Sequence, residues 1–279
     1  MRNVLWVIGW AGGLWGAGLV MRTGNFALAL LLLVFSLGLL WARAGISSLS
    51  ALIRFSLNPS IPAAKVTNSF NWGCYLFGYN LSLTIIGAIF VAFPMKKYLG
   101  ASFTPKPELA WAWVVAPVVE ELTFRLPLKY TAINLSVPAL IVTLFTVRGL
   151  LLKFRIFTMA TATDRWLWSA VFAILLASVV LILLRTEPVK RLASRIWLNH
   201  SRLVVYVSCF AFGLLHIANF RFTTLSAETL LLAPLLVLPQ IVSGFILAFT
   251  RVHLGMIWCI VLHAANNFLA YWLFSLGPR

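Results

Sequence analysis

Two neighbouring glutamates stand inside an apolar run of the chain. Glu120 and Glu121 lie in the run AWAWVVAPVVEELTFRLPL and are two of only six acidic residues in the sequence. A charged side chain at membrane depth costs about 2.5 to 3.5 kcal/mol on the scale measured for insertion by the translocon. Two such groups therefore indicate either strong partners or a chemical role. Arg125 is the next charge along the chain.

Other polar residues that can handle protons lie in separate apolar runs. His216 stands in CFAFGLLHIANF and His263 in MIWCIVLHAANNFLAYW, and Asn267 follows His263 by four residues. That spacing places the imidazole and the amide on one helical face. A single buried His or Asn more often joins helices, and a Glu pair with an Arg can be a neutralised ion cluster. Together, however, these groups supply a general base, a second proton-handling or ligating group, and donors for an oxyanion.

Helix geometry divides the two glutamates. At about 100° per residue, Arg125 lies about 40° around the helix from Glu121 but about 140° from Glu120. We therefore predict that Glu121 pairs with Arg125, which leaves Glu120 free to hold a water. Pro117 and Pro127 bracket the segment, and Pro127 is predicted to break or kink the helix just after Arg125.

The composition places these residues in a membrane. Hydrophobic residues make up 62% of the 279 residues, charged residues make up 10%, and the mean hydropathy is +0.97. Strand-like alternation is absent, so the sequence predicts an all-α, polytopic transmembrane bundle of about eight or nine helices. The shortest candidate span, 110–125, carries the glutamates. The candidate spans are 4–20, 26–42, 70–94, 110–125, 134–152, 166–184, 203–220, 229–250 and 253–275.

The chain is expected to form a single integral membrane domain. Residues 1–109 supply N-terminal spans and loops, and 110–279 form the core that holds the polar residues. The first apolar run is interpreted as an uncleaved span, because no small-x-small site leads into a polar mature domain. The longest polar connections are 43–69 and 185–202. The cysteines are predicted to be buried small side chains: Cys74, Cys209 and Cys259.

The net charge of +16 could indicate nucleic acid, but Lys and Arg are spread over nearly every loop. A membrane-surface role is the better interpretation, and no nucleic-acid partner is expected. The connection 185–202 has the densest basic cluster and favours the cytoplasmic side, although the orientation as a whole stays open. The small size and the lack of soluble appendages lead us to expect a prokaryotic plasma-membrane protein.

Three short motifs in order resemble a known family. Glu120–Arg125 fits EExxxR, Phe212–His216 fits FxxxH and His263–Asn267 fits HxxxN. On successive apolar segments, they resemble the CPBP (CAAX protease and bacteriocin-processing, or Abi) family of intramembrane proteases. The likeness covers residues 110–275, about 60% of the chain. One departure is Leu126-Pro127, where many members carry Gly after the Arg.

The resemblance implies an endopeptidase with its active site in the membrane. Glu120 and His216 would activate a water that attacks the scissile carbonyl, and His263 and Asn267 would donate hydrogen bonds to the oxyanion. Glu121 and Arg125 would support the segment. The substrate would be a membrane-associated protein that is prenylated or embedded in lipid.

Participation of a metal stays open at this point. Two His and a Glu make a zinc set, and zinc would lower the pKa of its bound water. The chain has no HExxH, the helical signature that brings two ligands and a base together. The metal-free scheme, which needs only the same residues, is slightly favoured.

Two other functions fit parts of the pattern. A proton- or ion-coupled transporter would use the Glu and His residues as a relay, and a non-catalytic membrane assembly factor would only keep the fold. Other intramembrane protease types fit less well. An aspartyl type needs two aspartates and the chain has only Asp164; a site-2 type needs HExxH; the one GxS match, Gly45-Ile46-Ser47, lies in a polar connection.

Overall fold

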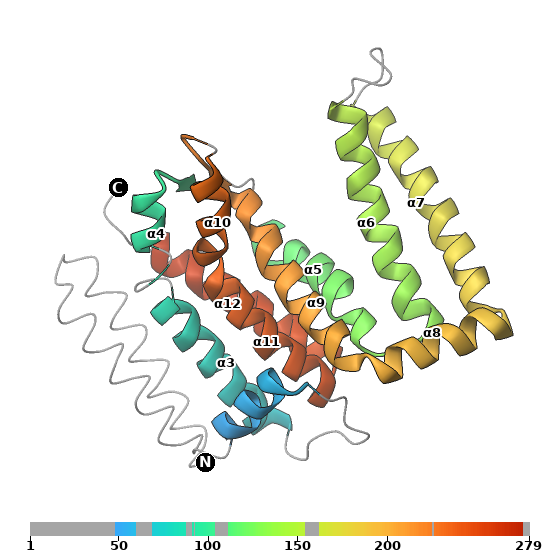
Figure 1. The fold of residues 1–279 in the computed structure, drawn as a ribbon, viewed down its shortest axis with the longest axis horizontal. Helices are drawn as coiled ribbons and strands as arrows, with labels where there is room; N and C mark the ends of the chain where they lie inside the picture. The colour runs from blue at the N-terminus through green and yellow to red at the C-terminus, as the bar shows by residue number, and fades with distance from the viewer. Residues whose placement is uncertain are drawn as a thin grey trace.

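The computed structural model describes residues 48–59, 69–87, 91, 93–103, 111–153, 162–224 and 226–275. These residues are helical almost throughout (Figure 1), which confirms the predicted all-α class. A two-stranded antiparallel sheet pairs β1 (Ser102–Phe103) with β2 (Phe220–Arg221). The predicted spans 4–20 and 26–42, including the uncleaved first span, lie outside the described residues.

Three described helices are long and apolar enough to cross a membrane. They are α6 (Ala132–Lys153), α7 (Ala162–Arg185) and α9 (Ser201–Leu215) with its 3-10 extension η4 (His216–Asn219). A fourth span results if α10 (Ala227–Leu236) and α11 (Leu238–His253), which meet at an angle of 44°, are counted together. The described part therefore supports a membrane protein with three or four such spans, and the predicted eight or nine helices are not confirmed.

Proline and glycine divide several of the predicted spans. The span predicted at 229–250 is broken at Val237, because Pro239 at the start of α11 lacks the N–H that would continue the ladder from α10. Gly255, with a φ of 107°, separates α11 from α12 (Met256–Ser275). This left-handed backbone conformation favours glycine.

The glutamate segment is also irregular. A π-helix, η2 (Trp111–Val115), leads into α5 (Ala116–Phe124), which carries the glutamates. The α-helix ends before Pro127, as the sequence predicts, and a 3-10 turn, η3 (Leu126–Leu128), follows. Within the predicted span 70–94, the structure describes α3 (Ser69–Gly87) and the beginning of α4 (Phe93–Tyr98).

Two predicted polar connections contain helices, so their assignment as connections was wrong in part. The helix Ser48–Leu57 lies within 43–69, and α8 (Glu187–Asn199) occupies most of 185–202. The helix Ser48–Leu57 is apolar but too short to cross a membrane, whereas α8 is both short and polar. The helix α8 has too few apolar residues to look like a span, but those residues recur at spacings of three and four, which is the helical pattern.

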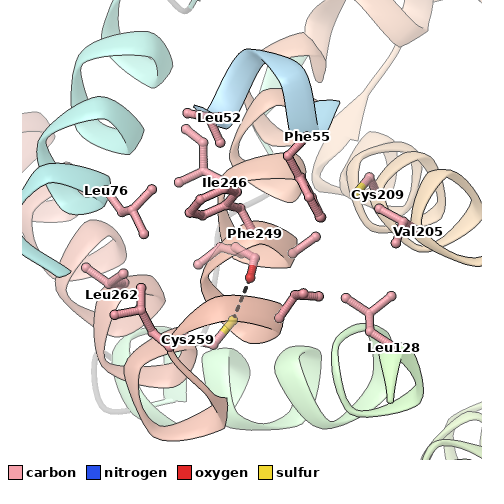
Figure 2. Packing of buried hydrophobic residues seen from close by; sticks show 14 of the residues in the cluster. Leu52, Phe55, Leu76, Leu128, Val205, Cys209, Ile246, Phe249, Cys259 and Leu262 are labelled. Carbon is pink, nitrogen blue, oxygen red and sulfur yellow. Dashed lines mark hydrogen bonds between the residues drawn. The ribbon is translucent and has the colours of Figure 1, made fainter. Parts of the chain in front are cut away.

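The helix α11 lies at the centre of the bundle. It packs against α3, α9 and α12, and Figure 2 shows its Ile246 and Phe249 between side chains of the surrounding helices. The cluster also contains Leu76, Val205 and Leu262, all buried. By contrast, α6 and α7 pair with each other to one side of this bundle (Figure 1), with most of their surface uncovered by protein. The bundle around α11 therefore positions the polar residues.

The close approach of α9 and α11 depends on Gly213. A Cβ placed there would overlap Cγ1 of Ile241 and lie 3.0 Å from the Ile241 backbone. We expect Gly213→Ala to lower the free energy of unfolding by about 1–3 kcal/mol through overpacking. Thermal unfolding of the purified protein in detergent measures this.

The matched control is Gly149→Ala in α6, where an added Cβ meets nothing within 4 Å. This variant is expected to gain about 0.5–1 kcal/mol from helix propensity. If Gly213→Ala and Gly149→Ala unfold at the same temperature, α9 and α11 do not approach as closely as described.

Candidate active site

The two glutamates occupy different environments although they are neighbours on α5. The side chain of Glu121 is fully buried, whereas that of Glu120 is 29% exposed. Successive residues of a helix project about 100° apart, so one carboxylate points into the packed bundle and the other to its margin. The chemistry of each must therefore be considered separately.

Glu121 is held by three side chains from two helices. Nε of Arg125 lies 3.7 Å from its Oε2, which gives the ion pair that the sequence predicts. His263 Nδ1 is 2.8 Å from Oε1, and the Cys259 thiol donates to Oε2 at 2.7 Å. A buried carboxylate persists only when charge and hydrogen bonds replace its lost hydration. Glu121 is accordingly a structural anchor that fixes α12 against α5.

Arg125 is as deeply buried as Glu121 and is itself fixed on several sides. Its Nη2 donates to the Gly244 carbonyl at 3.3 Å, and its guanidinium lies 4.1 Å from the centre of the Phe212 ring. Its own carbonyl accepts a hydrogen bond from Arg251 Nε at 3.1 Å. A Cβ on Gly244 would lie only 3.1 Å from the Cys209 carbonyl oxygen, so the absence of a side chain lets α9 and the guanidinium approach α11.

Glu120 faces the two histidines. Its Oε2 lies 3.8 Å from Nε2 of His216 and 3.5 Å from Nε2 of His263. These residues come from α5, from the junction of α9 with η4, and from α12. The structure thus brings together three groups that are separated by roughly 50 to 140 residues in the sequence. Five of the six predicted site residues are joined by direct contacts: Glu120, Glu121, Arg125, His216 and His263.

The partners of Nδ1 decide the protonation of both rings. His216 Nδ1 lies 2.7 Å from the Phe212 carbonyl, which can only accept, so Nδ1 carries the proton. His263 Nδ1 donates in the same way to the Glu121 carboxylate. In a neutral ring, each Nε2 is then an acceptor aimed at Glu120.

When both rings are neutral, Glu120 Oε2 and the two Nε2 atoms are all hydrogen-bond acceptors. Oε2 of Glu120 is inaccessible and has no hydrogen-bond partner within the described part of the chain. Acceptor atoms that lie 3.5 to 3.8 Å apart repel one another unless a proton or a water molecule between them donates hydrogen bonds to them. The arrangement is suited to holding a water and taking its proton.

Asn267, the sixth predicted residue, lies one helical turn beyond His263 on α12 and is half-buried. Its neighbour Asn266 is 7% exposed, and its Oδ1 has no hydrogen-bond partner among the described residues. Both amides lie within four residues of His263, so either can reach the same side of the helix.

The sequence interpretation missed three contributors. Cys259 was predicted to be only a buried small side chain; it is buried, yet it donates to Glu121. Phe212 supplies the carbonyl that orients His216, and Gly244 supplies one for Arg125. The first two precede a histidine by four residues, so their spacing was a usable signal, whereas nothing in the sequence marks Gly244.

Zinc does not fit these residues as they are placed. Among the residues that the structure describes, no group of three or more His, Cys, Asp or Glu side chains is arranged so that it could hold a metal ion. Glu121 is already committed to Arg125, His263 and Cys259. The scheme below therefore includes no metal.

An open apolar hollow of about 390 Å³ is lined by residues of α3, η2 and α12. Ala264, which follows His263, and Trp113, on the turn that leads into α5, are among its walls. No residue of the Glu120, His216 and His263 cluster lines this hollow, and its α12 residues lie on the side of that helix away from His263. The hollow is lined by Phe77, Trp113, Val114, Ala264, Ala265, Phe268 and Leu269.

The thiol of Cys259 provides a test of the anchor. Cys259→Ala is expected to lower the free energy of unfolding by about 1–3 kcal/mol beyond the packing loss, because the Glu121 carboxylate loses a donor. Cys259→Ser keeps a donor and should recover part of that loss. Denaturation in detergent measures both.

Cys209→Ala is the control for lost volume, since Cys209 is likewise fully buried. If Cys259→Ala and Cys209→Ala cost the same, the thiol contributes packing alone.

Comparison with known proteins does not assign this site to a family. No model of a protein family, no curated protein and no solved structure matches the chain. The likeness to the CPBP family therefore consists of the three motifs alone. What the chain does is inferred from the geometry of its own residues.

Proposed function

We propose that this chain is an intramembrane endopeptidase that hydrolyses a peptide bond of a membrane-associated protein. The observation that carries the proposal is the convergence of the Glu120 carboxylate with Nε2 of His216 and His263. Those atoms come from three helices and surround a position suited to a water. The resemblance of the three motifs to the CPBP family implies the same roles for Glu120, His216 and His263.

In the proposed reaction, Glu120 removes a proton from the water while the water oxygen bonds to the scissile carbonyl carbon. His216 accepts a hydrogen bond from that water through Nε2, because its Nδ1 is bound to the Phe212 carbonyl. The carbon–nitrogen bond then breaks, and Glu120 returns the proton to the leaving amine. The products are a carboxylic acid and an amine, and transfer of the acid proton to the amine gives a carboxylate and an ammonium, so the atoms and charges balance.

The oxyanion of the intermediate requires donors. His263 can donate from Nε2 only as the imidazolium, since its Nδ1 already donates to Glu121. In that state two carboxylates, Glu120 and Glu121, face two cations, Arg125 and His263, and the cluster is neutral overall. Asn267 would add an uncharged donor from the next turn of α12.

A substrate with an apolar group suits the surroundings. The helices α6 and α7 are apolar and of membrane-spanning length. A prenylated or lipid-embedded protein would reach the site from the lipid around such helices, and the location would be a prokaryotic plasma membrane.

A proton relay is the second candidate, because His263 bridges the two glutamates. The bridge leads from Glu120 to Glu121, which is fully buried and paired with Arg125. In the described part of the chain, that end of the relay meets the Arg125 ion pair and the buried Cys259 thiol, which holds its proton as a donor to Glu121. The lack of a continuing relay favours hydrolysis over transport. An assembly factor would not need a histidine between the two glutamates.

Glu120→Gln tests the proposal most directly. We expect it to lower cleavage by about 10²–10⁴-fold because the amide cannot take the proton. The fold should persist, since Oε2 makes no hydrogen bond within the described residues. New amino termini that appear in membranes expressing the natural chain, and disappear with Glu120→Gln, identify substrates for assay in reconstituted vesicles.

Retained cleavage by purified Glu120→Gln protein would refute the protease. Proton or ion flux into vesicles that is lost with Glu120→Gln, without any proteolysis, would identify a transporter. A phenotype that needs the protein but neither Glu120 nor flux would identify an assembly factor.

Asn267→Ala tests the oxyanion site. It is expected to lower kcat by about 10²–10³-fold with little change in KM, because the donor acts on the charge that develops in the transition state. Asn266→Ala is the neighbouring control and is expected to change stability more than kcat, since Asn266 is buried. The reverse pattern would assign the donor to Asn266.

A further inference from the structure

The helix α8 is amphipathic. Val189, Leu192, Ala193 and Ile196 recur at spacings of three and four residues and share one face. The remaining circumference carries most of the polar side chains: Glu187, Lys190, Arg191, Ser194, Arg195 and Asn199. This distribution is typical of a helix that lies at a boundary between apolar and polar phases.

Among the described elements, none buries the apolar face of α8. None of the residues of α8, all of which the structure describes, is buried. Leu192 is 59% exposed and Ile196 is 46% exposed. In a chain with membrane-spanning helices, an uncovered apolar stripe opposite a charged face is suited to the depth where acyl chains meet headgroups.

The position of α8 agrees with that depth. It connects α7 to α9 and runs across the ends of α6 and α7 rather than parallel to them (Figure 1). Since α6 and α7 are candidate spans, a helix that crosses their ends lies near the plane of the membrane surface.

The helix is fixed to the segment that follows the candidate active site. Trp197 Nε1 donates to the Pro127 carbonyl at 2.7 Å, and the Tyr130 hydroxyl donates to the Lys190 carbonyl at 3.3 Å. The rings of Tyr130 and Trp197 lie 6.2 Å apart. These contacts hold α8 in one orientation, so its charged face is a property of the fold and not of a free tail.

The charge at this end of the molecule is strongly positive. Residues 185–202 contain five Lys or Arg and one acid, Glu187. Glu187 pairs with Lys190 at 3.2 Å, and Arg191 and Arg195 lie one turn apart on the same face. A basic residue near an anionic membrane surface contributes about 1 kcal/mol of attraction.

We propose that α8 is an interfacial helix that binds the headgroups of anionic phospholipids through Arg191 and Arg195. Its apolar face lies among the first carbons of the acyl chains. Short basic segments are retained on the cytoplasmic side, so this surface belongs to the cytoplasmic leaflet. The proposal is independent of whether the chain is a protease.

Hydrogen exchange of the full chain in lipid nanodiscs tests the proposal. Backbone amides of 187–199 are expected to exchange more slowly in phosphatidylglycerol than in phosphatidylcholine, and added salt should reduce the difference. Arg191→Gln with Arg195→Gln is expected to weaken the apparent affinity for phosphatidylglycerol by about 30-fold, which corresponds to about 1 kcal/mol for each arginine. Titration of the phosphatidylglycerol fraction measures the shift.

Lys96→Gln with Lys97→Gln is the matched control. It removes the same charge from α4, at the opposite end of the molecule from α8 (Figure 1), and should leave the titration unchanged. Equal exchange in both lipids, or an equal shift with the control pair, would overturn the proposal. Protection by RNA in phosphatidylcholine nanodiscs, with none from phosphatidylglycerol, would also overturn it and point to nucleic acid.

Discussion

The buried ion pair between Glu121 and Arg125 is the interaction on which the site depends. Two charges taken out of water need partners in place of their hydration, and both Glu121 oxygens have donors whereas Nε and Nη1 of Arg125 make no hydrogen bond among the described residues. Here the partners come from three other helices: His263 and Cys259 on α12, the Gly244 carbonyl on α11, and the Phe212 ring on α9. The need to satisfy one carboxylate and one guanidinium therefore draws α5, α9, α11 and α12 into a single arrangement.

That arrangement explains how Glu120 differs from its neighbour. Glu121 has its cation and its donors, whereas Oε2 of Glu120 faces two imidazole nitrogens without a hydrogen bond within the described residues. A group left unsatisfied beside a fully satisfied one is costly unless it has a ligand or a reaction to serve. His263 connects the two, since its Nδ1 contacts the structural carboxylate and its Nε2 the proposed catalytic one. The stability of the anchor and the orientation of the proposed base are thus coupled through one ring.

Irregular backbone flanks several of the helices around these groups. The π-turn before α5, the 3-10 turn after it, and the bend between α10 and α11 all interrupt helices that uniform apolar composition would continue. Each interruption involves proline or lies next to it, and in lipid such breaks require neighbouring helices to satisfy the freed groups. The 3-10 turn also presents the Pro127 carbonyl to Trp197, which fixes α8 beside the site. The surface that we propose to bind lipid is therefore attached to the segment that we propose to be catalytic.

The sequence by itself determined the helical class, the membrane character and the pairs that lie one turn apart. Glu121 with Arg125 followed from spacing, because residues four apart on a helix are neighbours whatever surrounds them. The helix end near Pro127 followed from proline chemistry. Only the tertiary structure decided that His263 lies between both glutamates, that Cys259 donates to one of them, and that α8 stands where a polar connection was predicted. The His263 contact spans 142 residues of sequence, and such contacts depend on how whole helices pack, which no local pattern encodes.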